Sequence, residues 1–295
     1  MQRTRMAGVG VVALALASIA GCGTSGSTGP HVSTGPHVSP SGTSPPAGGE
    51  LPLGRWVAHD AVGEPTEVAV RIGEELEIHR GCWAQRATWD AAPDGGFVAT
   101  VTGAQGACHV DLAAAPAVPW LETARQYRRT ERGWQLLAAD GSVTATLLPA
   151  DAGSPRWPSS WPYLAAVPDA IATRSAGPAA LPSPLRPATT ADLTGTWLPP
   201  VTVRTSTRPF ATVSAVGDLT GSDGCNATTG RVTVGEGGRV VAVLRPQTAV
   251  GCDGYPVAAN LAGAARLGLA PDGRLVAVDA RGTVTAELVR GAAPR

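Results

Sequence analysis

The chain has no lysine, since all 23 of its basic residues are arginine. Lysine chemistry is therefore excluded, whether a Schiff base or the ammonium group of a phosphate-binding loop. Charged residues are also few, at 16%, and 23 acidic residues balance the 23 arginines. A net charge of zero provides no overall field that would attract nucleic acid or an anionic membrane surface.

Long apolar runs are missing too, apart from one near the amino terminus. That run, residues 6–20, is about fifteen residues long, whereas a membrane-spanning helix needs roughly twenty. Arg3 and Arg5 precede it in the charge pattern of an export signal, so residues 1–21 are predicted to be a signal peptide. The run ends in Ile19-Ala20-Gly21-Cys22, which resembles a bacterial lipobox.

The lipobox resemblance implies cleavage before Cys22 and attachment of lipid to Cys22. One acyl chain holds a protein only marginally at a membrane, whereas two or more hold it firmly. The protein is therefore expected to be exported and anchored at the outer face of the cytoplasmic membrane. The alternative is an ordinary secretory signal followed by an unmodified cysteine.

Residues 22–49 consist mostly of Gly, Ser, Thr and Pro and are predicted to form a disordered tether. A six-residue duplication within them places His31 and His37 in equivalent positions. A metal-binding pair is one interpretation of these histidines, and a by-product of tandem duplication is the favoured one.

Two segments, 50–150 and 191–291, share a series of landmarks, which indicates an internal duplication. The interval from Trp to Cys is 26 residues in the first copy and 28 in the second. The interval between the two cysteines is 26 and 27, and from the second Cys to a closing Gly it is 33 and 30. The landmarks are Trp56, Cys82, Cys108 and Gly141 in the first copy, and Trp197, Cys225, Cys252 and Gly282 in the second.

Each copy contains short β-branched segments separated by Gly-, Asp- and Pro-containing turns, together with one helical patch. The patches are residues 119–129 and 256–267. The predicted fold is mainly β: two tandem small antiparallel barrel-like domains, each with one short helix. Residues 151–190 are predicted to be a proline-rich linker. Its Trp157, Trp161 and Tyr163 are expected to pack against a barrel surface; the alternative is an exposed patch for a partner.

The landmarks of the second copy resemble the META (HslJ-like) domain. They are an opening Leu-x-Gly-x-Trp that ends at Trp197, a Gly-x-x-Gly-Cys-Asn motif with Gly224 and Asn226, a Thr-x-x-x-Cys segment, and a closing Asp-x-x-Gly strand. The resemblance covers about residues 191–291. It implies the barrel-like fold and an exported protein, but no defined activity. The first copy is degenerate, because Trp83 stands in place of the Asn.

The five cysteines divide into Cys22 and one pair in each copy. Paired cysteines outside the cytoplasmic membrane are usually bridged, so the bridges Cys82–Cys108 and Cys225–Cys252 are predicted. Each closes a loop of about 26 residues and contributes roughly 3 kcal/mol. This contribution to the stability of each domain is large, because only 4% of the residues are aromatic.

A zinc site is the alternative in the first copy, because His79, Cys82, Cys108 and His109 are suitable ligand types. The second copy has Ser222 and Asp253 at the places of the two histidines, which favours the bridge. No metal and no cofactor is expected.

Known catalytic motifs are missing from the sequence. Asp223 and Asp253 are candidates for an acid/base pair, although a role in turn formation is favoured for both. The amide of Asn226 is expected to bond to turn backbone. The predicted function is a non-enzymatic binding or stress-related module of the cell envelope, with an envelope protein or a small ligand as possible partner and no nucleic acid. The alternative is a carrier that holds a small apolar ligand in a barrel or in the cleft between the domains.

Overall fold

The computed structural model describes residues 50–60, 68–72, 75–80, 83–106, 117–149, 177–245 and 250–292, all within one compact unit, Pro46–Arg295. Several predictions lie outside these ranges. They concern the signal peptide, the lipid on Cys22, the tether, the Cys82–Cys108 bridge, His109, and the packing of Trp157, Trp161 and Tyr163. No helix in the described ranges is long and apolar enough to cross a membrane.

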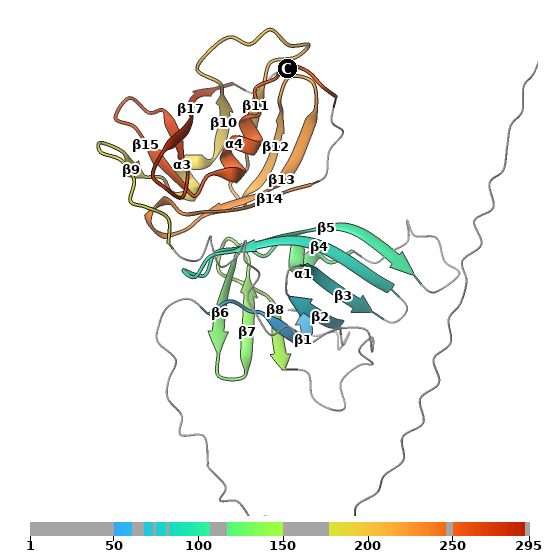
Figure 1. The fold of residues 1–295 in the computed structure, drawn as a ribbon. Helices are drawn as coiled ribbons and strands as arrows, with labels where there is room; N and C mark the ends of the chain where they lie inside the picture. The colour runs from blue at the N-terminus through green and yellow to red at the C-terminus, as the bar shows by residue number, and fades with distance from the viewer. Residues whose placement is uncertain are drawn as a thin grey trace, which may run out of the picture. The chain divides into compact units, whose positions relative to one another are not determined.

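The fold is mainly β, as the sequence predicts, and its strands form two antiparallel sheets (Figure 1). The first sheet has eight strands in the order β5-β4-β3-β2-β1-β8-β7-β6. Its elements are β1 (Gly54–Asp60), β2 (Val68–Ile72), β3 (Leu76–Arg80), β4 (Trp83–Ala91), β5 (Phe97–Gly106), α1 (Pro119–Glu122), β6 (Gln126–Thr130), β7 (Gly133–Leu137) and β8 (Val143–Pro149).

The second sheet has nine strands in the order β14-β13-β12-β11-β10-β17-β16-β15-β9. Its elements are β9 (Arg186–Pro187), α3 (Thr190–Leu193), β10 (Gly195–Leu198), β11 (Phe210–Val213), β12 (Asp218–Ser222), β13 (Ala227–Val234), the 3-10 turn η2 (Glu236–Gly238), β14 (Val240–Leu244), α4 (Val257–Gly263), β15 (Arg266–Leu269), β16 (Leu275–Val278) and β17 (Val284–Gly291).

Apart from β9, the two sheets share one topology. Each has five strands in sequence, then a helix, then three strands that pair back onto the first strand. Each also curls, so that a single β-bridge joins the start of its fifth strand to its sixth: Gly96 to Gln126 in the first sheet, and Arg239 to Arg266 in the second.

Local details repeat along with the topology. The indole Nε1 of Trp56 donates to Pro52 O at 2.9 Å, and that of Trp197 donates to Leu193 O at 2.8 Å. Both first strands begin at a glycine with positive φ, and both seventh strands carry a register shift one residue before they end.

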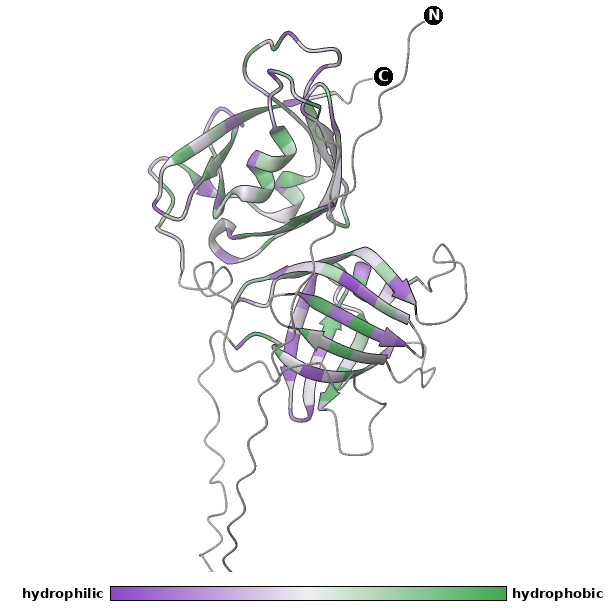
Figure 2. Ribbon diagram, turned by 45° about the vertical axis from the view of Figure 1, so that its right-hand side comes forward, coloured by the Kyte–Doolittle hydropathy of each residue, from purple (hydrophilic) through white to green (hydrophobic). Residues whose placement is uncertain are grey.

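Alternation of apolar and polar residues along the strands gives each sheet one buried face (Figure 2). The first core contains stacked or edge-on rings of Trp89, Phe97, Tyr127 and Trp134, with centroids 5.5–6.5 Å apart. The second core is mostly aliphatic around the fully buried Trp197, and α4 packs onto β11, β12, β14 and β17.

The helices differ from the prediction. They are shorter, because the residues that follow each one, Arg125 and Ala265, bond to the sheet through Leu137 O and Val278 O. The second half also contains α3, which was not predicted. A capping box between Thr189 and Asp192 begins this helix, and its Thr-x-x-Asp pattern is visible in the sequence. Within the predicted linker, β9 pairs with β15.

The turn at Gly217 provides a test of how closely the backbone packs in the second sheet. Gly217 has φ +83°, and a Cβ there would lie 2.4 Å from Val232 O. Gly273 has nearly the same conformation, φ +85°, but nothing within 4 Å of its Cβ position. Gly273→Ala should therefore cost only the left-handed strain of about 1–2 kcal/mol. Gly217→Ala should cost at least about 2 kcal/mol more, since backbone must move.

Chemical denaturation of the two variants checks this expectation. Equal losses of unfolding free energy would contradict the packing described around Gly217.

Candidate functional site

The Gly-x-x-Gly-Cys-Asn segment of the second half forms a tight turn between β12 and β13. The carboxylate of Asp223 accepts the backbone N–H groups of Cys225 at 2.8 Å and Asn226 at 2.6 Å. It also accepts the side-chain amide of Asn226 at 2.9 Å. Gly224 has φ +104°, and a Cβ there would lie 2.4 Å from Thr205 Oγ1, so the position requires glycine.

Asn226 connects this turn to the segment that carries Cys252. Its Oδ1 accepts from Val250 N at 2.7 Å, and its Nδ2 donates to Val250 O at 3.0 Å. The side chain, 5% exposed, thus pairs with Val250 as a neighbouring strand would. The disulfide Cys225–Cys252, with an S–S distance of 2.09 Å, joins the same two segments covalently.

Asp223 and Asp253, the suggested acid/base pair, lie in different environments. Burial acts to raise the pKa of Asp223, but the hydrogen bonds from Asn226 and Cys225 outweigh it and lower that pKa. Asp223 is thus held ionised as an acceptor for the turn, while Asp253 is exposed. A carboxylate oxygen of Asp223 lies within 4.8 Å of both sulfurs, but a disulfide offers no thiolate to a metal.

The other predicted site residues lie elsewhere. Trp197 is fully buried, and the guanidinium of Arg290 lies 4.6 Å from the centre of its ring. His79, from the zinc alternative, lies half-buried on β3, whereas Cys82, Cys108 and His109 fall outside the described residues.

A second candidate region is the contact between the two sheets, where the sequence suggested a cleft but none of the residues that form it. We call it the sheet interface: the outer faces of β4 and β5 packed against β13 and β14 (Figure 1). Its apolar centre consists of Ala92, Val98, Val241 and Val243. Strands at equivalent places in the two sheets therefore meet, as in an isologous dimer.

Two carboxylates of the first sheet cap backbone donors of the second. Asp90, 4% exposed, accepts from Ala91 N and from Ala242 N, both at 3.0 Å. Asp94 accepts from Glu236 N at 2.9 Å. Since β14 is the edge strand of its sheet, Asp90 satisfies an N–H that no neighbouring strand takes.

A charged cluster beside the sheet interface also connects the two halves. Arg125, 4% exposed, donates to Glu122 O and Ala124 O in its own half, and to Val216 O and Asp218 in the other. Burial, and then the nearby Arg231, lower the pKa of Arg125, whereas Asp218 and Glu122 raise it. The carboxylate of Glu122 pairs with Arg245 at 3.0 Å and Arg231 at 3.7 Å, and Arg231 also pairs with Asp218.

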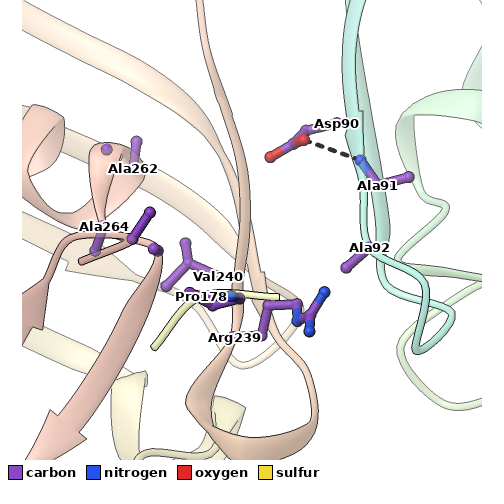
Figure 3. A pocket seen from close by; sticks show the side chains of 11 residues that line it. Asp90, Ala91, Ala92, Pro178, Arg239, Val240, Ala262 and Ala264 are labelled. Atoms are coloured by element: carbon purple, nitrogen blue, oxygen red, sulfur yellow. Dashed lines mark hydrogen bonds between the residues drawn. The ribbon is translucent and has the colours of Figure 1, made fainter. Parts of the chain in front are cut away.

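Beside Asp90 lies a cavity of about 160 Å³, lined from both halves (Figure 3). We call it the inter-sheet cavity. Its charged side chains are Asp90 and Arg239; the rest of the lining is Pro178, Val240, Gly263 and alanines at positions 91, 92, 262, 264, 265 and 280.

No family model matches this chain, and no curated protein or solved structure matches it significantly.

Replacement of Asn226 tests the motif turn. In Asn226→Asp the donor to Val250 O and Asp223 is lost, and a second carboxylate stands beside Asp223. We expect a loss of about 2–3 kcal/mol of unfolding free energy at neutral pH. Asn260→Asp, on α4 without a side-chain bond in the structure, serves as the control and should change it by less than about 1 kcal/mol. Urea titration measures both, and similar losses would refute the role given to Asn226.

Replacement of Arg125 tests the charged cluster. Arg125→Met leaves three backbone carbonyls without their donor, so we expect about 3 kcal/mol of destabilisation. The control is Arg128→Met on β6, where the arginine is exposed and should contribute less than about 0.5 kcal/mol. Thermal unfolding followed by circular dichroism compares the variants. The cluster has no stabilising role if Arg125→Met unfolds at the temperature of the control.

Proposed function

We propose that the chain is an exported protein, anchored through lipid on Cys22 at the outer face of the cytoplasmic membrane. In this proposal it acts as a non-enzymatic binding or stress-related module of the cell envelope, with two META-like repeats. The lipobox at residues 19–22 supports the anchor, and the landmark series supports the repeats.

One observation carries the non-enzymatic part of the proposal. Two side chains of the motif hold backbone in place: Asn226 bonds to Val250 and Trp197 bonds to Leu193. Gly224, which has no side chain, leaves room for the side chain of Thr205. Groups occupied in this way are not available to a substrate. The motif therefore supports a scaffold that presents a surface.

The shared topology supports a duplication as the origin of the chain. Strand order, helix position, the indole bonds and the register shifts coincide between the two sheets. The sheet interface then corresponds to the contact between two copies of one ancestral domain, now joined in one chain.

A carrier for a small ligand is the second candidate. Within the described residues both sheet interiors are filled with side chains, which does not favour a ligand inside a barrel. The inter-sheet cavity favours the other location considered for a ligand, the cleft between the domains.

The anchor is tested with Cys22→Ser in the full chain. The original chain should sediment with membranes, because two or more acyl chains add about 0.8 kcal/mol per buried CH₂. Cys22→Ser should instead remain soluble after export. Gly21→Ala keeps a small residue before the cysteine and should behave as the original chain. The same distribution for the original chain and Cys22→Ser would exclude a lipid anchor at this position.

A further inference from the structure

The guanidinium of Arg239 stands out among the described side chains because it lacks an acceptor. Its Nη1 is inaccessible to solvent, and no hydrogen-bond partner lies within reach. The two other buried atoms in this state are Thr144 Oγ1 and Arg231 Nε, and the Arg231 guanidinium is paired with carboxylates through other nitrogens. A buried donor on a charged group is costly when it is unmatched, so this position favours an added acceptor.

The surroundings of Arg239 make an anionic acceptor the best match. The neighbouring Arg266 donates to the backbone carbonyls of Pro178, Ala179 and Gly237, so uncharged groups satisfy it. Burial, and then the charge of Arg239, lower the pKa of Arg266, whereas the Asp94 carboxylate acts to raise it. Carboxylates form the strongest hydrogen bonds to a guanidinium, often through two parallel contacts.

The other residues that line the cavity limit the size and polarity of the rest of the ligand. Apart from Asp90, its lining is made of alanine, glycine, valine and proline, which offer no side-chain hydrogen bonds. The volume, about 160 Å³, is close to that of cavities that hold a benzene molecule. The ligand body should therefore be apolar and contain only a few carbons.

We propose that the inter-sheet cavity binds a small aliphatic monocarboxylate, whose carboxylate accepts from the Arg239 guanidinium and whose carbons pack against the alanine lining. Asp90 lies in the same lining and already accepts from Ala91 N (Figure 3). It also accepts from Ala242 N. A second negative group on the ligand would be repelled there, so the site selects monoanions over dicarboxylates. This inference rests on the second candidate function and names its ligand class.

Isobutyrate is a suitable probe, and isobutylammonium is its charge-reversed control. The full chain is titrated at constant ionic strength while the amide signals of Ala264 and Ala265 are followed by NMR. Isobutyrate should produce saturable shifts with a Kd of about 1 mM or below, and isobutylammonium should not. Lack of saturation with isobutyrate, or equal binding of the amine, would overturn the proposal.

Variants then assign the contacts. Arg239→Met keeps the stem but removes the donors, and should weaken isobutyrate binding at least about tenfold. Ala262→Leu fills the cavity without a change of charge and should have the same effect. Arg281→Met, at an exposed arginine near Ala280, should leave the Kd unchanged. An unchanged Kd in Arg239→Met would assign the shifts to nonspecific anion binding and reject the site.

Melting temperatures separate loss of binding from loss of fold. Without ligand, Arg239→Met should melt no lower than the original chain, because an unmatched buried donor has been removed. Isobutyrate should raise the Tm of the original chain only, since a ligand stabilises the state that binds it. If Arg239→Met fails to fold, the uncharged Ala262→Leu variant still decides the question. Anchoring through Cys22 is measured independently, so either proposal can fail without the other.

Discussion

The burial of the Asp90 carboxylate constrains the relation between the two sheets. A carboxylate that is 4% exposed is costly unless donors surround it, and Ala242 N supplies one of them from the other half. The same bond removes a free N–H from the edge strand β14, which would otherwise be open to pairing with another chain. Separation of the sheets would break this bond and expose the Ala242 N–H on the edge strand, so the bond couples edge protection to contact between the sheets.

The sheet interface is symmetric in its strands but not in its polar contacts. In the first sheet Asp90 on β4 pairs with Val98 on β5. The equivalent pair in the second sheet is Thr233 on β13 with Val241 on β14. A threonine therefore occupies the position of the buried aspartate. Ala265 occupies the position in the second sheet that Arg125 occupies in the first. Each directly precedes the residue that forms the isolated β-bridge at the start of the sixth strand. Two identical domains would have met the same polar groups twice. Here the first half supplies Asp90 and Arg125, and the second supplies their partners across the contact, Ala242 N, Val216 O and Asp218.

Features that have a local signal in the sequence could be predicted from it. Alternating β-branched residues predicted the mainly β class. Of the paired landmarks, Trp56 and Trp197 lie on the equivalent strands β1 and β10, and Gly141 and Gly282 lie in the equivalent turns before β8 and β17. The expected bond of Asn226 to turn backbone differs from the one found, because the side chain pairs with the backbone of Val250 in the segment that carries Cys252. The sheet interface could not be predicted, because it depends on outer faces whose valines and alanines resemble any strand. Arg239 and Asp90 are 149 residues apart, and no local pattern connects them.

The two cores show how one topology accommodates different side chains. Strand pairing identifies which positions of the two sheets are equivalent. Three aromatic residues of the first sheet, Trp89, Phe97 and Trp134, are equivalent to the aliphatic residues Val232, Val240 and Leu275 of the second. The second core therefore loses the volume of three rings, and close packing requires that other atoms occupy it. Helix α4 has seven residues where α1 has four, and it buries Val257, Ala258 and Leu261 within the curl of the sheet. A longer helix thus replaces aromatic rings, and its carboxyl end, at Ala262–Ala265, forms one wall of the inter-sheet cavity. The segment that fills the second core therefore also lines the cavity.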